Sequence, residues 1–252
     1  MLLAEKIREV NMKHLKLFCV VASLLLSVSA GLAQSGTCGA NLTWTFDSAT
    51  GTLYINGEGK MTDYSSTPPW RSLVVRRVEI NNGVTNIGNR AFISTYLENI
   101  IIPSSVTTIG DYAFQSCTNL TSIDIPEGVK SIGNNAFTNC RYLASITIPQ
   151  SVTSIGNSAF YGCEKLTSID IPEGVTNIGR FAFSGCYGLT SIIIPSSVTS
   201  ISEGVFSSCV NLTSIIIPEG VKSIGKDAFF HCVNLTSIII PKDLPPTRRR
   251  FS

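Results

Sequence analysis

The sequence is poor in charge. Charged residues make up 14% of its 252 residues and hydrophobic residues 44%, whereas about 25% of a typical domain is charged. High hydrophobicity combined with few charges excludes an ordinary disordered region. Apart from residues 1–33, the chain holds 15 basic and 15 acidic residues, so its charge balance gives no sign of a nucleic-acid partner.

Histidine is nearly absent. It occurs only at His14 and His231, which leaves little material for histidine-based catalysis or metal binding. No nucleophile with a base, and no pair of carboxylates, stands apart from positions that an internal repeat fixes. We therefore expect no enzyme activity, no catalytic residue, no metal site and no cofactor, and we expect His231 to be an exposed loop residue.

Long hydrophobic runs are absent except near the N-terminus. Lys13 and Lys16 precede the almost wholly apolar residues 17–28, and small residues follow up to Ala33. A basic start, an apolar middle and a small-residue end predict a secretory signal peptide over residues 1–33. The run is too short for a membrane span, which needs about 20 apolar residues. Residues 1–11 do not belong to such a signal, because Met12 is its natural start.

This signal predicts where the protein is found. We expect export, a secreted or cell-surface location, and a mature chain that begins at Gln34 or Gly31 and has no transmembrane segment.

What the sequence has in abundance is repetition. Prolines recur every 23 residues from Pro103 to Pro241, and cysteines recur at the same spacing from Cys117 to Cys232. The unit reads L-T-S-I-x-I-P-x-x-V-x-x-I-G-x-x-A-F-x-x-C-x-x. A fixed period of this length is the signature of a solenoid. About eight strands are predicted, which start at Val75, Leu97, Leu120, Leu143, Leu166, Leu189, Leu212 and Leu235.

The columns of the repeat predict the structure of one coil. From Leu120 to Ile125 apolar and polar residues alternate, which indicates a short strand. From Ile132 to Cys140 apolar residues recur at helical spacing, which predicts a helix of one or two turns, and Gly133 is expected to permit a tight turn. Strands of successive coils should stack as a parallel sheet about 4.8 Å apart, each coil burying its neighbour's apolar face.

The unit resembles a known family. Its I-P-x-x-V-x-x-I-G-x-x-A-F-x-x-C signature is similar to the BspA-like leucine-rich repeat of bacterial surface antigens, over residues 75–241. Residues 36–59 resemble that family's N-terminal cap, and their own alternation predicts a β-hairpin that turns between Asp47 and Gly51. The expected fold is a right-handed α/β solenoid, with a signal at 1–33, a cap at 34–74, the solenoid at 75–244 and a tail at 245–252.

The repeated cysteines leave three explanations open. A cysteine on every coil favours buried free thiols that act as small apolar core residues. Disulfides between neighbouring coils are compatible with export and with a coil spacing of about 5 Å. A metal site would need ligands that converge on one point, whereas these cysteines line up along an edge.

One outward column of the predicted sheet is the candidate binding site. Its N-terminal end is polar and its C-terminal end is apolar, with serines and threonines beside it. Such residues also simply suit a strand, but stacked exposed isoleucines often mark an interaction surface. The column consists of Glu79, Ile101, Asp124, Thr147, Asp170, Ile193, Ile216 and Ile239.

The resemblance implies a non-enzymatic protein-binding module that adheres to host matrix proteins or to other cells. The expected partner is an extracellular matrix protein or a second copy of the chain, and not a nucleic acid. The alternative is a structural spacer, or a truncated fragment of a larger surface protein, with no ligand of its own.

Overall fold

Each coil of the repeat carries a short strand after its leucine position. The computed structural model describes residues 34–242 and 244, so the expected signal peptide and the tail lie outside the described residues. These first strands are β5 (Arg77–Ile80), β7 (Asn99–Ile101), β9 (Ser122–Asp124), β11 (Ser145–Thr147), β15 (Ser214–Ile216) and β17 (Ser237–Ile239). Between β11 and β15 the strand is reduced to bridges that join Asp170 to Ile193 and Ile193 to Ile216.

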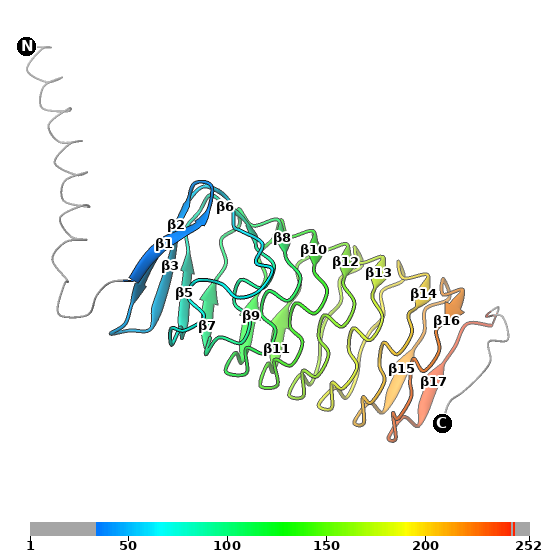
Figure 1. Ribbon diagram of the computed structural model, residues 1–252. Coiled ribbons are helices and arrows are strands. Elements are labelled where there is room, and N and C mark those ends of the chain that lie inside the picture. Colours follow the sequence, from blue (N-terminus) through cyan, green and yellow to red (C-terminus); the bar gives the residue numbers. More distant parts are fainter. Residues whose placement is uncertain (1–33, 243, 245–252) are drawn as a thin grey trace, which may run out of the picture. The chain divides into compact units, whose positions relative to one another are not determined.

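A second strand follows the proline turn of each coil. These strands are β6 (Val84–Ile87), β8 (Thr108–Ile109), β10 (Ser131–Ile132), β12 (Ser154–Ile155), β13 (Asn177–Ile178), β14 (Ser200–Ile201) and β16 (Ser223–Ile224). The strands that pair within each set do so in parallel and in the register of the repeat, as with Ser122 opposite Ser145 and Ile132 opposite Ile155. The ladders are interrupted between β7 and β9 and between β13 and β14. Successive coils therefore lie side by side, as Figure 1 shows. The parallel solenoid with 23-residue spacing is confirmed.

The N-terminal segment extends both ladders of strands. Strands β2 (Leu42–Asp47) and β3 (Thr52–Gly57) form the expected antiparallel hairpin, and β1 (Gln34–Gly39) pairs antiparallel with β2 as a third strand. Strand β3 then pairs in parallel with β5, and β4 (Gly59–Lys60) pairs in parallel with β6. The side chains that this segment buries, among them Trp44 and Ile55, thus continue the core of the coils.

A stack of aromatic rings runs through the core. The phenylalanine of the A-F pair is buried in every coil, and adjacent rings lie parallel, for example Phe137 and Phe160 with centroids 5.3 Å apart. Trp70 continues the stack into the N-terminal segment, 5.9 Å from Phe92, and its Nε1 donates to the carbonyl of Ala91. Each ring packs against the rings of the neighbouring coils. The stack therefore contributes to the interface that stabilises each pair of adjacent coils.

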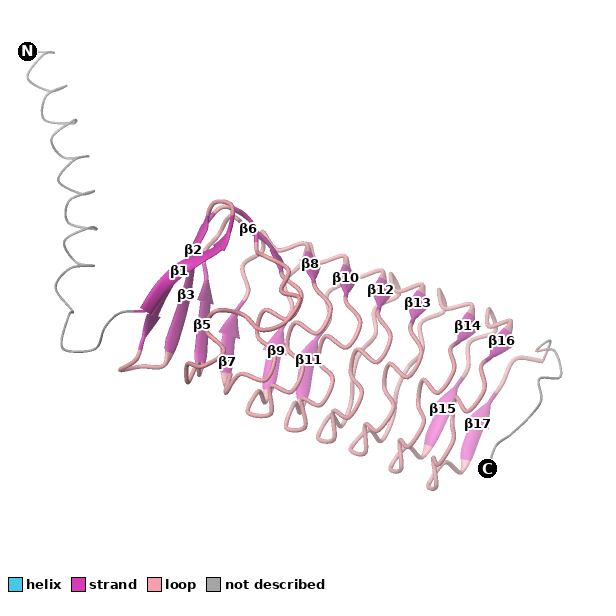
Figure 2. Cartoon of the chain, in the orientation of Figure 1, coloured by secondary structure: helices cyan, strands magenta, loops and turns pink. Residues whose placement is uncertain are grey.

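The helix expected after each second strand is not formed. No helix occurs within residues 34–242, as Figure 2 shows, so the α part of the expected α/β fold was wrong. Two residues of each coil have a left-handed backbone, with φ between 51° and 72°, and such residues interrupt a right-handed helix. They are Arg90, Tyr112, Asn135, Ser158, Phe181, Gly204 and Asp227 before the A-F pair, and Ser94, Ser116, Asn139, Gly162, Gly185, Ser208 and His231 after it.

Hydrogen bonds between coils replace those of a helix. Asn135, Phe137 and Asn139 donate their backbone N–H groups to carbonyls of the next coil at 2.7–2.8 Å. The residues between them donate to the carbonyl three positions back, which is the pattern of tight turns rather than the four-residue pattern of an α-helix. The apolar spacing from Ile132 to Cys140 thus belongs to two consecutive turns.

The glycine after the second strand is needed because adjacent coils pack closely there. The φ of Gly133 is not in the left-handed region, but a Cβ there would lie 2.6 Å from the backbone carbon of Gly110 in the preceding coil. Gly156 has the same relation to Gly133, also at 2.6 Å. Gly133 does begin a tight turn, since its carbonyl accepts the N–H of Ala136, but it is the contact between the backbones of adjacent coils that requires a glycine at this column.

The seven described cysteines are free thiols, and all but Cys232 are buried. Their role as core residues is therefore confirmed. Each thiol in the repeats also donates a hydrogen bond to a phenylalanine carbonyl of the preceding coil, as Cys140 does to Phe114 at 3.1 Å. In the coil without a cysteine, Thr95 donates from its hydroxyl to the carbonyl of Phe92 at 2.9 Å.

Candidate interaction surface

The residues of the predicted binding column pair with one another along the first strands in three groups. Glu79 is opposite Ile101, Asp124 is opposite Thr147, and Asp170 is followed by the three isoleucines. Parallel in-register pairing produces this arrangement, because each coil places the same repeat position at the same point of the strand. The structure thus pairs every residue of the column with at least one other member, and the longest continuous group runs from Asp170 to Ile239.

The apolar end of the column is strongly exposed. Ile193 is 74% exposed, Ile216 63% and Ile239 57%. We call these three residues the isoleucine strip. Their chain neighbours Ile192 and Ile215 are buried, because alternate residues of a strand point to opposite faces. The strip is therefore an apolar surface that no described residue covers.

The polar end of the column differs in exposure and in partners. Glu79 is half-buried, whereas Asp124 and Asp170 are exposed. The hydroxyl of Thr147 donates to a carboxylate oxygen of Asp124 at 3.0 Å, which connects adjacent coils. Ile101 is an isolated exposed isoleucine within this end, 56% exposed. An apolar surface of several adjacent residues exists only at the other end of the described column.

Exposed serines border the isoleucine strip, because Ser191, Ser214 and Ser237 lie two residues before the isoleucines on the same face. Beyond them Thr190, Thr213 and Thr236 are exposed, and each threonine hydroxyl donates to the carbonyl of the equivalent residue in the preceding coil at 3.3–3.4 Å. Their hydroxyl protons thus serve the stacking of the coils. A partner that lies on the strip would meet hydroxyl oxygens that can still accept a hydrogen bond.

The N-terminal segment lengthens the same face, which the sequence analysis missed. Tyr54 in β3 lies opposite Glu79, and Thr45 in β2 lies opposite Tyr54. The polar end of the column therefore continues across β3 and β2. Tyr54 and Thr45 do not follow the repeat, so the sequence does not show that they continue the column. This becomes clear only once the hairpin is seen to pair with the first strand of the coils.

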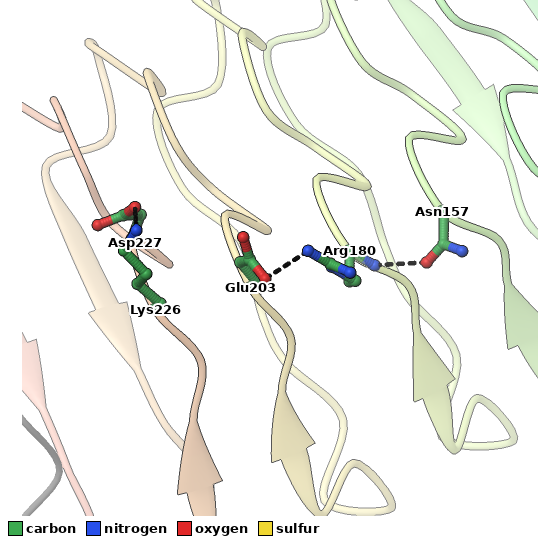
Figure 3. Close-up of polar contacts among 5 residues, drawn as sticks. All are labelled: Asn157, Arg180, Glu203, Lys226 and Asp227. Atoms are coloured by element: carbon green, nitrogen blue, oxygen red, sulfur yellow. Dashed lines mark hydrogen bonds and ion pairs between the residues drawn. The ribbon is translucent and has the colours of Figure 1, made fainter.

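A second row of polar residues follows the second strands. Figure 3 shows its C-terminal part, where the side-chain oxygen of Asn157 accepts the backbone N–H of Arg180 at 2.8 Å. Arg180 then forms an ion pair with Glu203 at 2.5 Å, and Lys226 lies 3.5 Å from Asp227. The same N–H to side-chain oxygen contact, at 2.6–2.8 Å, joins the earlier members Asp63, Asn89, Asp111, Asn134 and Asn157. These acceptors are occupied in holding coils together, which argues against a ligand-binding role.

The buried thiols stay protonated at neutral pH and are therefore unreactive. Burial raises the pKa of Cys117 to about 11 and that of Cys186 to about 12, and it raises the pKa of Cys140 well above its usual range. Thiols need to be ionised to act as nucleophiles or metal ligands. Across residues 34–242 no group of three or more histidine, cysteine, aspartate or glutamate side chains is arranged to hold a metal ion. His231 is exposed, at a left-handed position after the A-F pair.

The part of the chain that the structure describes contains no helix long and apolar enough to cross a membrane.

Solved structures with the same architecture come from bacteria. A leucine-rich repeat protein of Bacteroides ovatus is 33% identical with a TM-score of 0.66, over 82% of this chain and 53% of that one. The chain thus spans about half the length of that protein. A Treponema pallidum leucine-rich repeat protein is 29% identical over 79% of this chain and 91% of that one, with a TM-score of 0.63. The pneumococcal vaccine antigen PcpA, 16% identical with a TM-score of 0.54 over 85% of this chain and 72% of that one, shares the fold alone. No curated protein matches.

A family model agrees with the repeat. The model for the BspA type leucine-rich repeat region matches residues 71–149 and 130–248, with 6 copies. Parallel coils, the 23-residue spacing and the buried phenylalanine and cysteine columns are the structural basis of that match. The chain therefore belongs to the BspA-type leucine-rich repeat family.

Proposed function

We propose that this chain is a non-enzymatic, exported module that binds a protein partner through the isoleucine strip. The observation that carries the proposal is the stacking of three exposed isoleucines at a column where the fold accepts polar residues. Thr147 and Asp170 occupy equivalent positions in neighbouring coils, so the strand does not require an apolar side chain there. Contiguous exposed apolar surface is unfavourable in water unless a partner covers it.

The family supports this reading. Leucine-rich repeat proteins generally serve as binding scaffolds for other proteins and not as enzymes. A rigid sheet face suits this role, because its side chains are held at fixed spacing before the partner arrives. The partner that we propose is a host matrix protein, contacted by a chain that is secreted or held at the cell surface.

The isoleucine strip can be tested with a variant that we expect to keep the fold. Replacing Ile193, Ile216 and Ile239 together by threonine keeps β-branched side chains at outward strand positions. We expect the triple variant to lose most of its solid-phase binding to fibronectin or fibrinogen at an unchanged melting temperature. The control is Ile101→Thr, which removes an equally exposed isoleucine at the polar end and should leave binding unchanged.

Three other results would point elsewhere. Undiminished binding by the triple variant would contradict the proposal and leave the polar end, from Glu79 to Asp170, as the candidate surface. If the wild-type chain binds no matrix protein but sedimentation shows association that the triple variant loses, the partner is a second copy. If it shows neither property, the chain is a structural spacer or a fragment without a ligand of its own.

Export has its own test. The N-terminal pattern of residues 1–33 predicts cleavage before Gln34, or before Gly31. N-terminal sequencing of the protein from the culture medium or the cell surface should find one of these residues first. A chain that still begins at Met1 would refute export through this signal.

A further inference from the structure

A polar groove lies on the loops that precede the first strands of three successive coils. It has a volume of about 540 Å³, which is within the range of small-molecule binding sites. Ser116 and Thr118 come from the loop before β9, Asn139 and Arg141 from the loop before β11, and Glu164 from the next loop. None of these residues belongs to the column of the proposed protein-binding face.

The walls of the groove are held in place by the backbone. Ser116 and Asn139 both have a φ of 59°, and their N–H groups donate to carbonyls of the next coil at 2.8 and 2.7 Å. The N–H of Lys165 donates to the carbonyl of Arg141 at 3.1 Å. Because these bonds are made between backbone groups of the protein itself, binding would cost little ordering of the loops.

The lining is rich in hydrogen-bond donors and has no aliphatic side chain. Arg141 and Lys165 carry positive charge, and Asn139 adds an amide, while Glu164 is the one carboxylate in the lining. Glu164 lies 3.5 Å from Arg141, so its charge is partly balanced and the groove as a whole is positive. Lysine and arginine donors favour a carboxylate on the ligand.

An exposed aromatic ring completes the groove. Tyr142 is 59% exposed and belongs to the lining, next to Arg141 in the chain. A tyrosine ring offers an apolar surface and a hydroxyl at its tip. A ligand with a flat CH face, many hydroxyl groups and a carboxylate would use all of these features. A peptide would find no pocket for an apolar anchor side chain.

We propose that this groove binds a short acidic saccharide, with its carboxylate held by Lys165 and Arg141 and a sugar ring against Tyr142. Three coils at a spacing of about 4.8 Å span about 10 Å, which is enough for two or three sugar units. Hydroxyls of the sugar can exchange hydrogen bonds with Ser116, Thr118 and Asn139, since hydroxyls both donate and accept.

The probe for this site is trigalacturonic acid, titrated into the protein and followed by calorimetry. Maltotriose, which lacks the carboxylate, and acetate, which lacks the sugar ring, should each bind at least about tenfold more weakly, because each makes only part of the contacts. Binding should also weaken as salt increases, because the charges in the groove are exposed to solvent. Equal binding of acetate would reduce the site to a simple anion contact and overturn the proposal.

Substitutions in the groove should change the affinity for trigalacturonic acid in opposite directions. Lys165→Gln and Tyr142→Ala should each weaken binding about tenfold, whereas Glu164→Gln should strengthen it, since it removes the carboxylate that competes for Arg141. Lys130→Gln and Tyr187→Ala, which alter exposed residues outside the groove, are the matched controls and should bind as the wild type does. Because all five side chains are half-buried or exposed, melting temperatures should stay unchanged. Wild-type binding by both Lys165→Gln and Tyr142→Ala, or no binding of the probe by the wild-type protein, would refute the proposal.

Discussion

At the scale of single residues, the left-handed positions explain why a helical spacing did not produce a helix. The sequence held part of the signal, because Asn139, Gly162 and Gly185 follow one another at the second left-handed column and both residue types tolerate positive φ. At the first column Tyr112 and Phe181 give no such signal. There, contacts between coils determine the backbone, and a single repeat read in isolation cannot show them.

Gly156 is required by a close backbone contact and Gly185 by its positive φ. Alanine substitutions can distinguish the two reasons. At Gly156 an added Cβ would lie 2.6 Å from backbone atoms of the preceding coil, so Gly156→Ala must push coils apart. We expect a loss of about 1–3 kcal/mol or more in the free energy of unfolding. At Gly185 the φ of 72° is the obstacle and the nearest atoms are 3.6 Å away, so Gly185→Ala should cost about 1–2 kcal/mol. Urea denaturation measures both, and a larger loss at Gly185 would contradict the contact between backbones.

The raised pKa values of the buried thiols allow us to predict how the free energy of unfolding depends on pH. Burial raises the pKa of Cys117 to about 11 and of Cys186 to about 12, from an ordinary value of 9.0. The folded chain therefore keeps protons that the unfolded chain releases, so the stabilising contribution is complete below pH 9 and is lost as pH rises through the folded values. Urea midpoints should fall from pH 9 upward, and less steeply in Cys186→Ala.

Thiol labelling provides the matching chemical measurement. At pH 8 the buried cysteines should not react with a thiol reagent in the native protein, and they should react once denaturant is added. Rapid labelling of all the repeat cysteines in the native state would contradict their burial.

At the scale of elements, alternation in the sequence predicted the first strands and the hairpin but not β1. In β1 only Cys38 is buried, so that strand shows no apolar pattern. Its place is set by antiparallel pairing with β2, from Gln34 opposite Phe46 to Gly39 opposite Leu42. The periodicity of a sequence records burial, and a strand that is held mainly by backbone hydrogen bonds leaves little trace in it.

One coil departs from the repeat in a way that the preceding coil explains. Gly204 replaces the usual larger residue at the first left-handed position, and a Cβ there would lie 2.1 Å from the ring of Phe181. The bulky Phe181 and the missing side chain at Gly204 are thus a matched pair in adjacent coils.

A double-mutant cycle tests this pair. Gly204→Ala alone should destabilise the chain by about 1–3 kcal/mol, because the ring of Phe181 occupies the space of the new methyl group. In a background with Phe181→Ser, which is the residue at the equivalent Ser158, the same substitution should cost clearly less. A coupling energy near zero, measured by urea denaturation, would show that the two residues do not interact.

At the scale of the whole molecule, the repeat predicted which residues share a surface, whereas it did not predict the character of that surface. The residues of the column pair with one another in three groups because the register of the strands follows the period. The half-buried state of Glu79 and the continuation through Tyr54 depend on the N-terminal segment, which is outside the repeat. The polar groove was also missed, because its residues occupy equivalent positions on either side of the repeat cysteine where the residue type changes from coil to coil.

The two tryptophans allow a test of whether this molecule unfolds as one unit. Trp44 and Trp70 both lie in the N-terminal segment, so their fluorescence reports on that segment, while circular dichroism reports on all coils. Phe160 lies in a central coil and stacks on Phe137 and Phe183, so Phe160→Ala should cost about 3–5 kcal/mol. Because parallel strands join the N-terminal segment directly to β5 and β6, we expect both signals to shift together to lower urea concentration.

The control for this experiment is the neighbouring residue. Tyr161→Ala removes an exposed aromatic ring next to Phe160 in the sequence and should shift neither signal. If Phe160→Ala lowers the midpoint measured by circular dichroism while tryptophan fluorescence keeps its wild-type midpoint, the N-terminal segment folds independently of the central coils. The stack of rings from Trp70 to Phe229 would then join neighbouring coils without making the described chain cooperative over its length.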